Sequence, residues 1–534
     1  MMKSKLWIAG FFILVAIPLG IVAFLTIKVD PYFHYHEPDT STYYYTIYNQ
    51  RSQNDGILHH FDYEGVITGT SMTENFLTSE AEQLFGCSFV KIPFSGGTFN
   101  EINNNLKVAL STHPNLKVII RGLDMGKFIE DKDAIREDLG EYPTYLYNEN
   151  PFDDVQYLFN RDVVFKNVYE MLKARRSSEF QPGITSFDAY SNWMGKFPFG
   201  VKALFPDGTK VTYYNVAQEE LTEDEERMVR ENVRQNVTEL AEQYPDVTFY
   251  YFFTPYSAAW WQMLINAGTF DKQIRAEQIV IEEILKTPNI KLYSFNDLTD
   301  ITTDLNHYKD NPHYAGWINS LILKYIKDGT GLLTEDNYRE YLSKEKDFYG
   351  SFDYQKCFDE QEDYEKDYYA AALLDEEIYG IHPYHLTEKD VPETVLRNAE
   401  IVADQHDGEF GILCKGRLDR VPGKKVSVSD YIRDNDAYNG ARITIDEIGP
   451  YRYLVVYGKK NADMGQPGIY LYDQDGKVLA QTTAEYKKLD DQWHQYMIDV
   501  SAFNGKVDIV LQGGYVDNTG REGSEFVFSD ITLY

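Results

Sequence analysis

The chain has 534 residues, of which 43% are apolar and 25% charged, and this length exceeds what one hydrophobic core usually organises. We therefore expect at least two folded domains rather than a disordered chain. The 84 acidic and 51 basic residues give a formal net charge of −33. Such a field repels nucleic acid, teichoic acid phosphates and anionic lipid surfaces unless a local basic cleft overrides it, and nucleic-acid binding is not expected.

An uncharged stretch from Leu6 to Ile27 follows Lys3 and Lys5 at the amino terminus. At about 1.5 Å per residue, a helix of this length crosses the roughly 30 Å of hydrocarbon in a bilayer. No small-residue cleavage site follows the stretch, so we expect residues 1–29 to be an uncleaved membrane anchor. The lysines that precede it predict that the rest of the chain lies outside the cytoplasm, as a single-pass protein of the cell membrane.

The three cysteines, Cys87, Cys357 and Cys414, are widely spaced and leave room for a single disulfide at most. The histidines of His34–His36 and His59–His60 have no carboxylate or cysteine at metal-ligand spacing, so no metal site is expected. No phosphate- or dinucleotide-binding motif is present, and no cofactor is expected. An extracytoplasmic chain with so few cysteines favours a bacterial, Gram-positive surface.

Short apolar runs alternate with helical patterns from Val66 to about Asp328, which is typical of a parallel α/β sheet. Five runs predict five strands: GVITGTS, SFVKIPFSGG, LKVIIRGLD, VTFYYFFTPYS and IKLYSFNDL. Helices are predicted at residues 73–85, 98–112 and 222–244. The last of them has Thr222 and Glu225 in capping-box positions.

The predicted α/β domain covers residues 30–332 and contains a Tyr- and Asp-rich insertion at about 127–216. Insertions of this size at strand ends often shape a substrate cleft. Residues 333–392 are charged and predict a linker region of helical connectors. From residue 393 to 534, alternating runs separated by Asp-Gly, Asn-Gly and Gly-Gly turns predict an antiparallel sandwich. The phrases WHQYMIDVSAFNGKVDIVLQ and FVFSDITLY resemble the galactose-binding-like jelly rolls of carbohydrate-binding modules.

Ser71 stands where the first predicted strand meets a predicted helix. Because ligands meet the carboxyl ends of the strands in a parallel sheet, a hydroxyl there reaches the cleft, and helix N–H groups stabilise an oxyanion beside it. Serine is also a favoured helix N-cap, and an isolated strand–Ser–helix junction is more often a cap. Ser71 alone does not distinguish these two roles.

A serine nucleophile needs a base and a carboxylate that orients the base. The segment DLNHYKDNPHYAGWIN, after the fifth predicted strand, offers two Asp-x-x-His pairs: Asp304 with His307, and Asp310 with His313. We prefer the later pair, because His313 leads into the apolar helix start YAGWINSLILKYI, which would fix the loop. The simpler interpretation is a surface histidine in a polar loop.

Two more strand ends carry residues of interest. Gly96 and Gly97 follow the second strand, where a bare backbone N–H could approach a substrate oxygen, and Gly122 and Asp124 follow the third. Glycine at such a turn more often serves a positive φ angle than catalysis.

In chain order, these blocks at successive strand ends resemble the SGNH (GDSL-like) hydrolase superfamily, over roughly residues 66–328. The resemblance implies a flavodoxin-like three-layer sandwich with a five-stranded parallel sheet. It also implies a catalytic serine with its Asp-x-x-His partners and an oxyanion hole of backbone N–H groups. The matching residues are Ser71, Asp310 and His313 for catalysis, and Ser71 with Gly96 or Gly97 for the oxyanion hole.

Two positions depart from the superfamily pattern. Thr70 stands where Gly-Asp-Ser has its aspartate, and Asp124 stands where the third block usually supplies an asparagine donor. An ionised Asp124 would repel an oxyanion. With these departures, the anchor and the long insertion, the chain resembles the branch of the superfamily that contains the teichoic-acid D-alanylation protein DltD and the alginate O-acetyltransferase accessory proteins. This resemblance implies a protein that acts on a cell-envelope polymer together with a membrane-bound O-acyltransferase.

The sequence therefore predicts serine-dependent acyl transfer or ester hydrolysis on a cell-surface polysaccharide or another envelope polymer. The alternative is an anchored glycan-binding or scaffold protein whose SGNH-like domain has lost its activity. The altered third block favours the alternative, and the retained Ser71, Asp310 and His313 favour the enzyme. Aromatic pairs such as Trp260–Trp261 fit either sugar stacking or a hydrophobic core.

Overall fold

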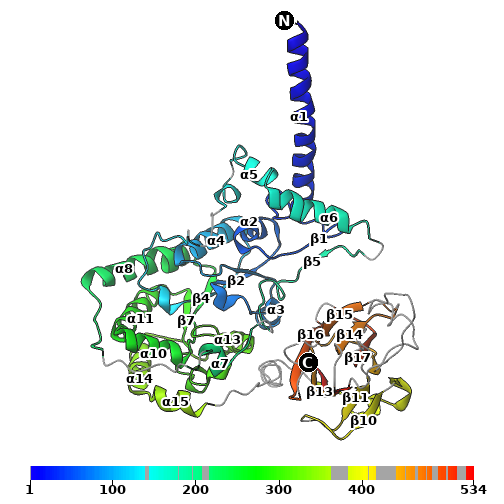
Figure 1. Cartoon of the computed structure of the whole chain (residues 1–534). Helices are drawn as coiled ribbons and strands as arrows, with labels where there is room; N and C mark the ends of the chain where they lie inside the picture. Colours follow the sequence, from blue (N-terminus) through cyan, green and yellow to red (C-terminus); the bar gives the residue numbers. More distant parts are fainter. Residues whose placement is uncertain are drawn as a thin grey trace. The chain divides into compact units, whose positions relative to one another are not determined.

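The chain forms two compact units, Met1–Tyr364 and Glu365–Tyr534 (Figure 1). This computed structural model describes all residues except 1, 137, 139–142, 149, 178–179, 195–196, 207, 209–215, 362–382, 398, 407, 416–439, 452, 463–466, 475, 477, 484–490, 501–502 and 514–524.

The first unit is built around a sheet whose five strands all run parallel. The strands are β2 (Gly65–Gly69), β3 (Phe89–Pro93), β4 (Val118–Leu123), β6 (Thr248–Phe253) and β7 (Ile290–Tyr293). Their spatial order, β3-β2-β4-β6-β7, is the 2-1-3-4-5 order of doubly wound sheets. All five predicted strands are confirmed. Because β2, β3 and β4 are almost fully buried, they are mostly apolar without strict alternation, although β3 contains the buried Lys91 and β4 the buried Arg121.

Helices form two groups around this sheet. Helices α2 (Gln50–His60), α4 (Phe99–Thr112), α8 (Glu223–Val233) and α11 (Phe270–Ile284) form one layer, linked through the π-helical turn η6 (Arg234–Thr238). Helices α3 (Thr78–Phe85) and α13 (Gly316–Asp328) pack on each other, and Figure 1 shows the sheet between the two groups. The predicted capping box of Thr222 and Glu225 is present at the start of α8.

The first unit also contains further helices and two short strands. They are α1 (Met2–Val29), β1 (Tyr44–Tyr45), η1 (Ser71–Thr73), η2 (Met125–Lys127), η4 (Thr144–Leu146), α5 (Val155–Leu158), η5 (Val163–Val168), α6 (Tyr169–Ala174), β5 (Gly183–Ile184), α7 (Val201–Leu204), α9 (Glu239–Gln243), α10 (Ala258–Ala267), α12 (Thr299–Thr302), η7 (Leu305–His307), α14 (Tyr338–Ser351) and α15 (Tyr354–Glu360).

Helices α14 and α15 occupy part of the predicted linker, yet they pack into the core of the first unit. Tyr338, Tyr341 and Tyr349 of α14 are buried at helical spacing, although charged residues separate them in the sequence. Tyr349 stacks on Trp261, with 4.3 Å between ring centroids. Since Trp260 and Trp261 are both buried, this pair belongs to the core rather than to a sugar-binding surface. Residues 362–382 of the predicted linker lie outside the described residues.

The second unit contains two antiparallel sheets, as the turn pattern predicts. The first has the order β10-β11-β18-β13-β16, with β8 paired to β18, and the second has the order β15-β14-β17-β12-β9. Their inner faces share one hydrophobic core, which includes Leu454 and Phe528 from one sheet and Leu471 and Ile509 from the other. The strands are β8 (Tyr384–His385), β9 (Leu396–Arg397), β10 (Ala399–Val402), β11 (Gly411–Lys415), β12 (Gly440–Ile445), β13 (Tyr453–Ala462), β14 (Gly468–Tyr472), β15 (Val478–Thr483), β16 (His494–Asp499), β17 (Val507–Gln512) and β18 (Glu525–Leu533).

Among the described residues, α1 is the one helix long and apolar enough to cross a membrane. Its Gly10–Val29 stretch has a mean hydropathy of 2.6 and is almost wholly exposed. A secretory signal sequence near the amino terminus has the same length and composition.

Candidate active site

Ser71 lies just beyond the carboxyl end of β2, the strand next to one edge of the parallel sheet. The chain leaves β2 through Gly69, whose φ of +148° favours glycine, and an added Cβ would lie 2.6 Å from Thr73 Cγ2. A short 3₁₀ turn, η1, begins at Ser71, and its N-cap is Thr70. The capping role therefore belongs to Thr70 rather than to Ser71, and α3 begins only at Thr78.

Ser71 forms a chain of two short hydrogen bonds with His313 and Asp310, which lie about 240 residues away in the sequence. Ser71 Oγ is 2.7 Å from His313 Nε2, and His313 Nδ1 is 2.7 Å from Asp310 Oδ1. With the ring proton on Nδ1, the hydroxyl donates to Nε2 and the Nδ1–H donates to the carboxylate. This is the arrangement in which an imidazole takes the proton of an attacking serine.

The loop that carries this pair is closed by its own hydrogen bonds. The backbone N–H of His313 donates to Asp310 Oδ1 at 2.9 Å, and Lys309 Nζ donates to Asp310 Oδ2 at 3.2 Å. Partial burial raises the pKa of Asp310, but the hydrogen bonds from His313 and the charge of Lys309 outweigh it, and the net pKa is lowered. Asp310 is therefore an ionised acceptor at neutral pH.

The two histidines of this segment have different surroundings. His307 lies against Trp317, with 5.0 Å between ring centroids, and its Nδ1 is 3.2 Å from the carbonyl oxygen of Ile301. Its own aspartate, Asp304, is 3.6 Å away. The structure thus brings His313, and not His307, to Ser71.

Two backbone N–H groups just beyond the carboxyl ends of the neighbouring strands β2 and β3 are candidate oxyanion donors. No described residue accepts a hydrogen bond from the N–H of Ser71 or from that of Gly96. The N–H of Gly97, by contrast, donates to the carbonyl of Phe94 at 2.7 Å and closes a turn. Of the two candidate glycines, Gly96 has a backbone N–H that donates to no described residue, whereas the N–H of Gly97 is already used within the protein.

Side chains that sequence reasoning missed hold the Gly96 turn in place. Gln50 of α2 accepts from the backbone N–H of Ser95 at 2.6 Å, and its amide donates to Glu74 Oε1 at 2.6 Å. Arg136, from the insertion, donates to the carbonyl of Gly96 at 3.0 Å. These contacts join elements far apart in the sequence, so no local motif signals them.

The two departures from the SGNH pattern contact each other. Thr70 Oγ1 donates to Asp124 Oδ2 at 2.6 Å, and the hydroxyl of Tyr256 donates to Asp124 Oδ1 at 2.6 Å. Burial raises the pKa of Asp124, and these two hydrogen bonds oppose the rise. Asp124 thus anchors the residue that precedes Ser71. Both of its oxygens accept hydrogen bonds, so it offers no donor to an oxyanion in its ionised form.

A buried lysine supports the chain after Ser71. Lys91 on β3 is fully buried, and its Nζ donates to the carbonyls of Glu74 at 2.6 Å and Phe76 at 2.9 Å. Burial lowers the pKa of Lys91 to about 7, although the charges of Asp188 and Glu74 act in the opposite direction. The amine therefore loses its proton more readily than an exposed lysine does.

The insertion at 127–216 supplies an aromatic wall beside the imidazole. Trp193 meets His313 edge to face, with 5.9 Å between ring centroids. Lys309 Nζ lies 4.8 Å from the ring centroid of Trp193 and 4.5 Å from that of Phe197, which is half exposed. Part of the insertion therefore lies beside His313.

In the part of the chain that the structure describes, no three His, Cys, Asp or Glu side chains lie close enough together to hold a metal ion. The three cysteines are free thiols, so the single disulfide that the sequence leaves open is not formed.

Fold and site together define a doubly wound α/β unit with a Ser–His–Asp chain, followed by a unit of antiparallel sheets. No family model matches the sequence, and no curated protein matches it. Among solved structures, a protein described as a platelet activating factor of Streptococcus pneumonia is similar to 53% of this chain over 91% of its own length, with 12% identity and a TM-score of 0.28.

A two-domain esterase active on acetylated mannans covers 88% of this chain and 90% of its own length, with 11% identity and a TM-score of 0.21. A C-terminal carbohydrate-binding module of a laminarinase from Zobellia galactanivorans covers 28% of this chain, with 11% identity and a TM-score of 0.16. Since every one of these TM-scores is below 0.5, the likenesses carry no argument about activity or substrate.

Proposed function

We propose that the first unit is an SGNH-type serine enzyme that transfers acyl groups or hydrolyses esters. The observation that carries this proposal is the hydrogen-bonded chain from Ser71 through His313 to Asp310. A carboxylate, an imidazole and a serine hydroxyl in this order are the groups that nucleophilic acyl transfer requires. The proposed fold is the flavodoxin-like three-layer sandwich, with the second unit as a jelly roll.

In the proposed mechanism, Ser71 Oγ attacks the carbonyl carbon of an acyl ester while His313 Nε2 takes the hydroxyl proton. Backbone N–H groups of Ser71 and Gly96 donate to the oxyanion of the tetrahedral intermediate. The ester C–O bond then breaks, and the imidazolium gives its proton to the leaving oxygen. An acceptor hydroxyl or water next gives a proton to His313 and attacks the acyl carbonyl carbon. The bond between that carbon and Ser71 Oγ then breaks, and the imidazolium returns its proton to Ser71 Oγ. Asp310 orients the imidazole and stabilises its charged form throughout.

The proposed setting is the outer face of a cell membrane. Helix α1 would be a single-pass anchor in a Gram-positive envelope, with both units extracytoplasmic. The substrate would be a cell-surface polysaccharide or another envelope polymer, bound in part by the carbohydrate-binding jelly roll, and a membrane-bound O-acyltransferase would supply acyl groups. The length and hydropathy of α1 support the anchor, and the resemblance of the sequence to the DltD branch supports the substrate and the partner.

A fluorophosphonate probe tests the nucleophile, because it phosphonylates activated serines. We expect stoichiometric labelling of the wild-type chain, no labelling of Ser71→Ala and a large loss with His313→Ala. His307→Ala is the matched control and should label like the wild type. Labelling lost with His307→Ala but kept with His313→Ala would reverse the assignment, and no labelling at any pH would refute a serine nucleophile.

The second candidate is an anchored glycan-binding or scaffold protein without activity. The specific observation in its favour is Asp124, which stands at the usual donor position and accepts hydrogen bonds through both oxygens. This candidate predicts glycan binding that is unaffected by Ser71→Ala, together with no probe labelling.

A further inference from the structure

Large apolar side chains are exposed in residues 152–176, which we call the juxtamembrane segment. The segment contains α5, η5 and α6. Its exposed side chains are Phe152 at 86%, Val155 at 53%, Phe159 at 41%, Phe165 at 64% and Tyr169 at 54%. Apolar groups of this size gather on a surface mainly where they meet a membrane or a partner.

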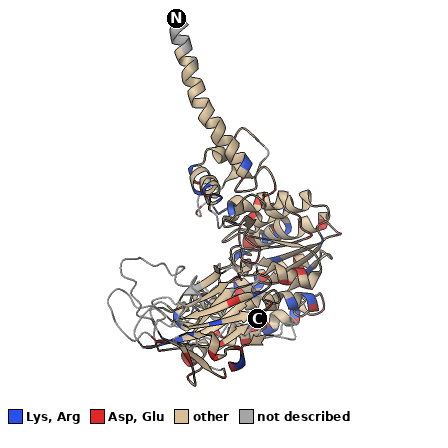
Figure 2. Cartoon of the chain, turned by 90° about the vertical axis from the view of Figure 1, so that its right-hand side faces the viewer, with Lys and Arg blue, Asp and Glu red and all other residues tan. Residues whose placement is uncertain are grey.

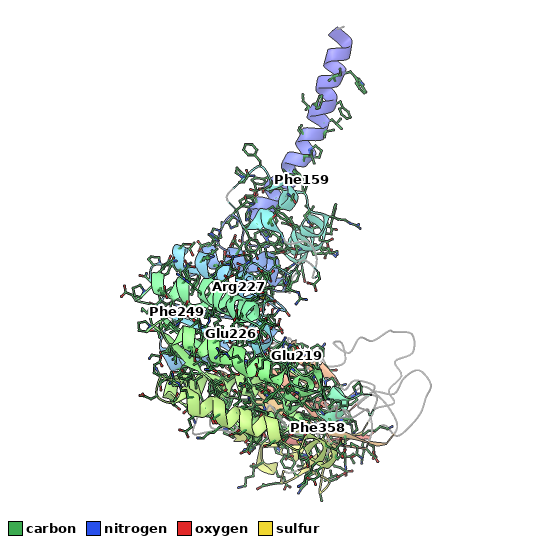
Figure 3. The ribbon with its side chains drawn as sticks, turned by 90° about the vertical axis from the view of Figure 1, so that its left-hand side faces the viewer. Phe159, Glu219, Glu226, Arg227, Phe249 and Phe358 are labelled. Atoms are coloured by element: carbon green, nitrogen blue, oxygen red, sulfur yellow. The ribbon has the colours of Figure 1, made fainter. Side chains whose placement is uncertain are left out.

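The juxtamembrane segment packs against the end of α1, as Figure 1 shows for α5 and α6 and Figure 3 for Phe159. Thr26 Oγ1 donates to the carbonyl of Leu158 at 3.3 Å. Thr26 lies one residue before the end of the apolar stretch Leu6–Ile27, whose helical length matches the roughly 30 Å of hydrocarbon. If α1 spans a bilayer, Thr26 lies at the hydrocarbon boundary, and the segment that contacts it lies at the same level.

Buried hydrogen bonds fix the segment to the residues that follow α1. The hydroxyl of Tyr157 donates to Asp30 Oδ1 at 2.7 Å, and the hydroxyl of Tyr35 donates to Asp154 Oδ2 at 2.9 Å. Asp30 is 1% exposed and also accepts from the backbone N–H of Tyr35 at 2.7 Å. The height of the segment relative to α1 is therefore set by the fold.

The charge of the segment is opposite to that of the whole chain. Residues 152–176 contain five basic and four acidic side chains, a formal charge of +1 in a chain of −33, and all five basic ones lie within residues 161–176. Figure 2 shows basic residues around the lower end of α1. Basic residues interleaved with aromatic ones on a short helical segment are typical of interfacial helices that bind anionic lipid. The basic residues are Arg161, Lys166, Lys173, Arg175 and Arg176.

We propose that the juxtamembrane segment lies in the headgroup layer of the outer leaflet and binds anionic phospholipid. Its aromatic side chains insert between the headgroups, and its basic side chains meet lipid phosphates. This inference rests on the proposed membrane anchor but not on the proposed catalysis. With α1 and the segment both in the membrane, the first unit has two attachments, so that Ser71 is held at a fixed height and orientation above the lipid.

Spin labels on the full chain in nanodiscs test the position of the segment. Single cysteines replace Phe159 and Phe165, in a background whose native cysteines are serines. Leu14→Cys in the anchor is the lipid reference. Lys344→Cys on α14 is the water reference, because its side chain is 69% exposed and α14 lies at the other end of the unit from α1 (Figure 1). The measured quantity is the ratio of the spin label's accessibility to oxygen to its accessibility to a water-soluble nickel chelate. This ratio rises with depth in lipid.

At positions 159 and 165 we expect accessibility ratios between that of the lipid reference, Leu14→Cys, and that of the water reference, Lys344→Cys. It also predicts higher ratios in discs of equal parts phosphatidylcholine and phosphatidylglycerol than in phosphatidylcholine alone. Lys166→Glu with Lys173→Glu should remove that lipid dependence. Ratios equal to the water reference would overturn the inference, as would protection from both reagents, which indicates a protein partner. A water-like ratio at Leu14 would refute the anchor, and the inference with it, without bearing on fluorophosphonate labelling.

Discussion

The hydrogen bond between His313 and Asp310 allows a quantitative prediction for Asp310→Asn. The bond is 2.7 Å long, and a hydrogen bond to a charged group contributes about 1.5–3 kcal/mol net. The Asp310 side chain is 44% exposed, so solvent screening places the loss at the lower end, about 1.5–2 kcal/mol. This corresponds to a roughly 10- to 30-fold loss of kcat/KM, since about 1.4 kcal/mol is tenfold.

The loss should be smaller than that caused by the same change in a buried triad. Replacing the fully buried aspartate of serine proteases costs about 10⁴-fold. The assay is hydrolysis of p-nitrophenyl acetate across a pH series. Because asparagine does not stabilise the imidazolium, the acidic limb of the kcat/KM profile of Asp310→Asn should also move to lower pH. A purely structural role for Asp310 would lower the rate without moving that limb.

Asp304→Asn is the matched control, since Asp304 belongs to the other Asp-x-x-His pair and lies beside His307. It should retain wild-type kcat/KM and an unchanged pH profile. If Asp310→Asn stays within twofold of the wild type, or if Asp304→Asn causes the larger loss, Asp310 does not orient the base.

Three further predictions concern residues around the site. Thr70→Val removes one donor from the buried carboxylate of Asp124 and should lower the free energy of unfolding by about 1–3 kcal/mol in urea titrations. Thr70→Ser keeps the hydroxyl and should restore most of that stability. Equal losses in Thr70→Val and Thr70→Ser would argue against the hydrogen bond. Burial lowers the pKa of Lys91 to about 7 in the folded chain. Above that pH the unfolded chain binds more protons than the folded one, so the contribution of Lys91 to the free energy of unfolding should rise by about 2 kcal/mol from pH 7 to 9. The Lys91→Met variant should lack that rise, and an identical slope would contradict it. Gln50→Leu removes the hydrogen bond that Gln50 accepts from the N–H of Ser95 beside Gly96. The variant should lower kcat more than it raises KM for p-nitrophenyl acetate. A change in KM alone would mean that Gln50 only binds substrate.

The sheet of the first unit could be predicted because each strand is short, buried and flanked by helical periodicity. Its order then follows from the doubly wound pattern. The helical character of the predicted linker could also be predicted, but its packing into the core could not. In α14, Tyr338, Tyr341 and Tyr349 lie at helical spacing but are surrounded by charged residues, so the average composition resembles a solvated connector. The spacing of the tyrosines, rather than the composition, was the informative signal.

The candidate site was predictable as a set of strand-end residues, but its details were not. The order of blocks places Ser71 and His313 at the same edge of the sheet, and the structure adds their contact. Which glycine keeps a free N–H depends on a local turn, because Gly97 donates to Phe94. The contact of Thr70 with Asp124 joins two strand ends 54 residues apart, and no spacing rule predicts it.

The proposed mechanism requires that Ser71 becomes acylated during turnover. Rapid-quench mass spectrometry of the peptide that contains Ser71, after mixing the full chain with p-nitrophenyl acetate, detects this intermediate. We expect one acetyl group on Ser71, formed in a burst of p-nitrophenol and absent from Ser71→Ala and His313→Ala. An unmodified peptide during continued ester turnover, or an acetyl group on another residue that survives Ser71→Ala, would contradict it.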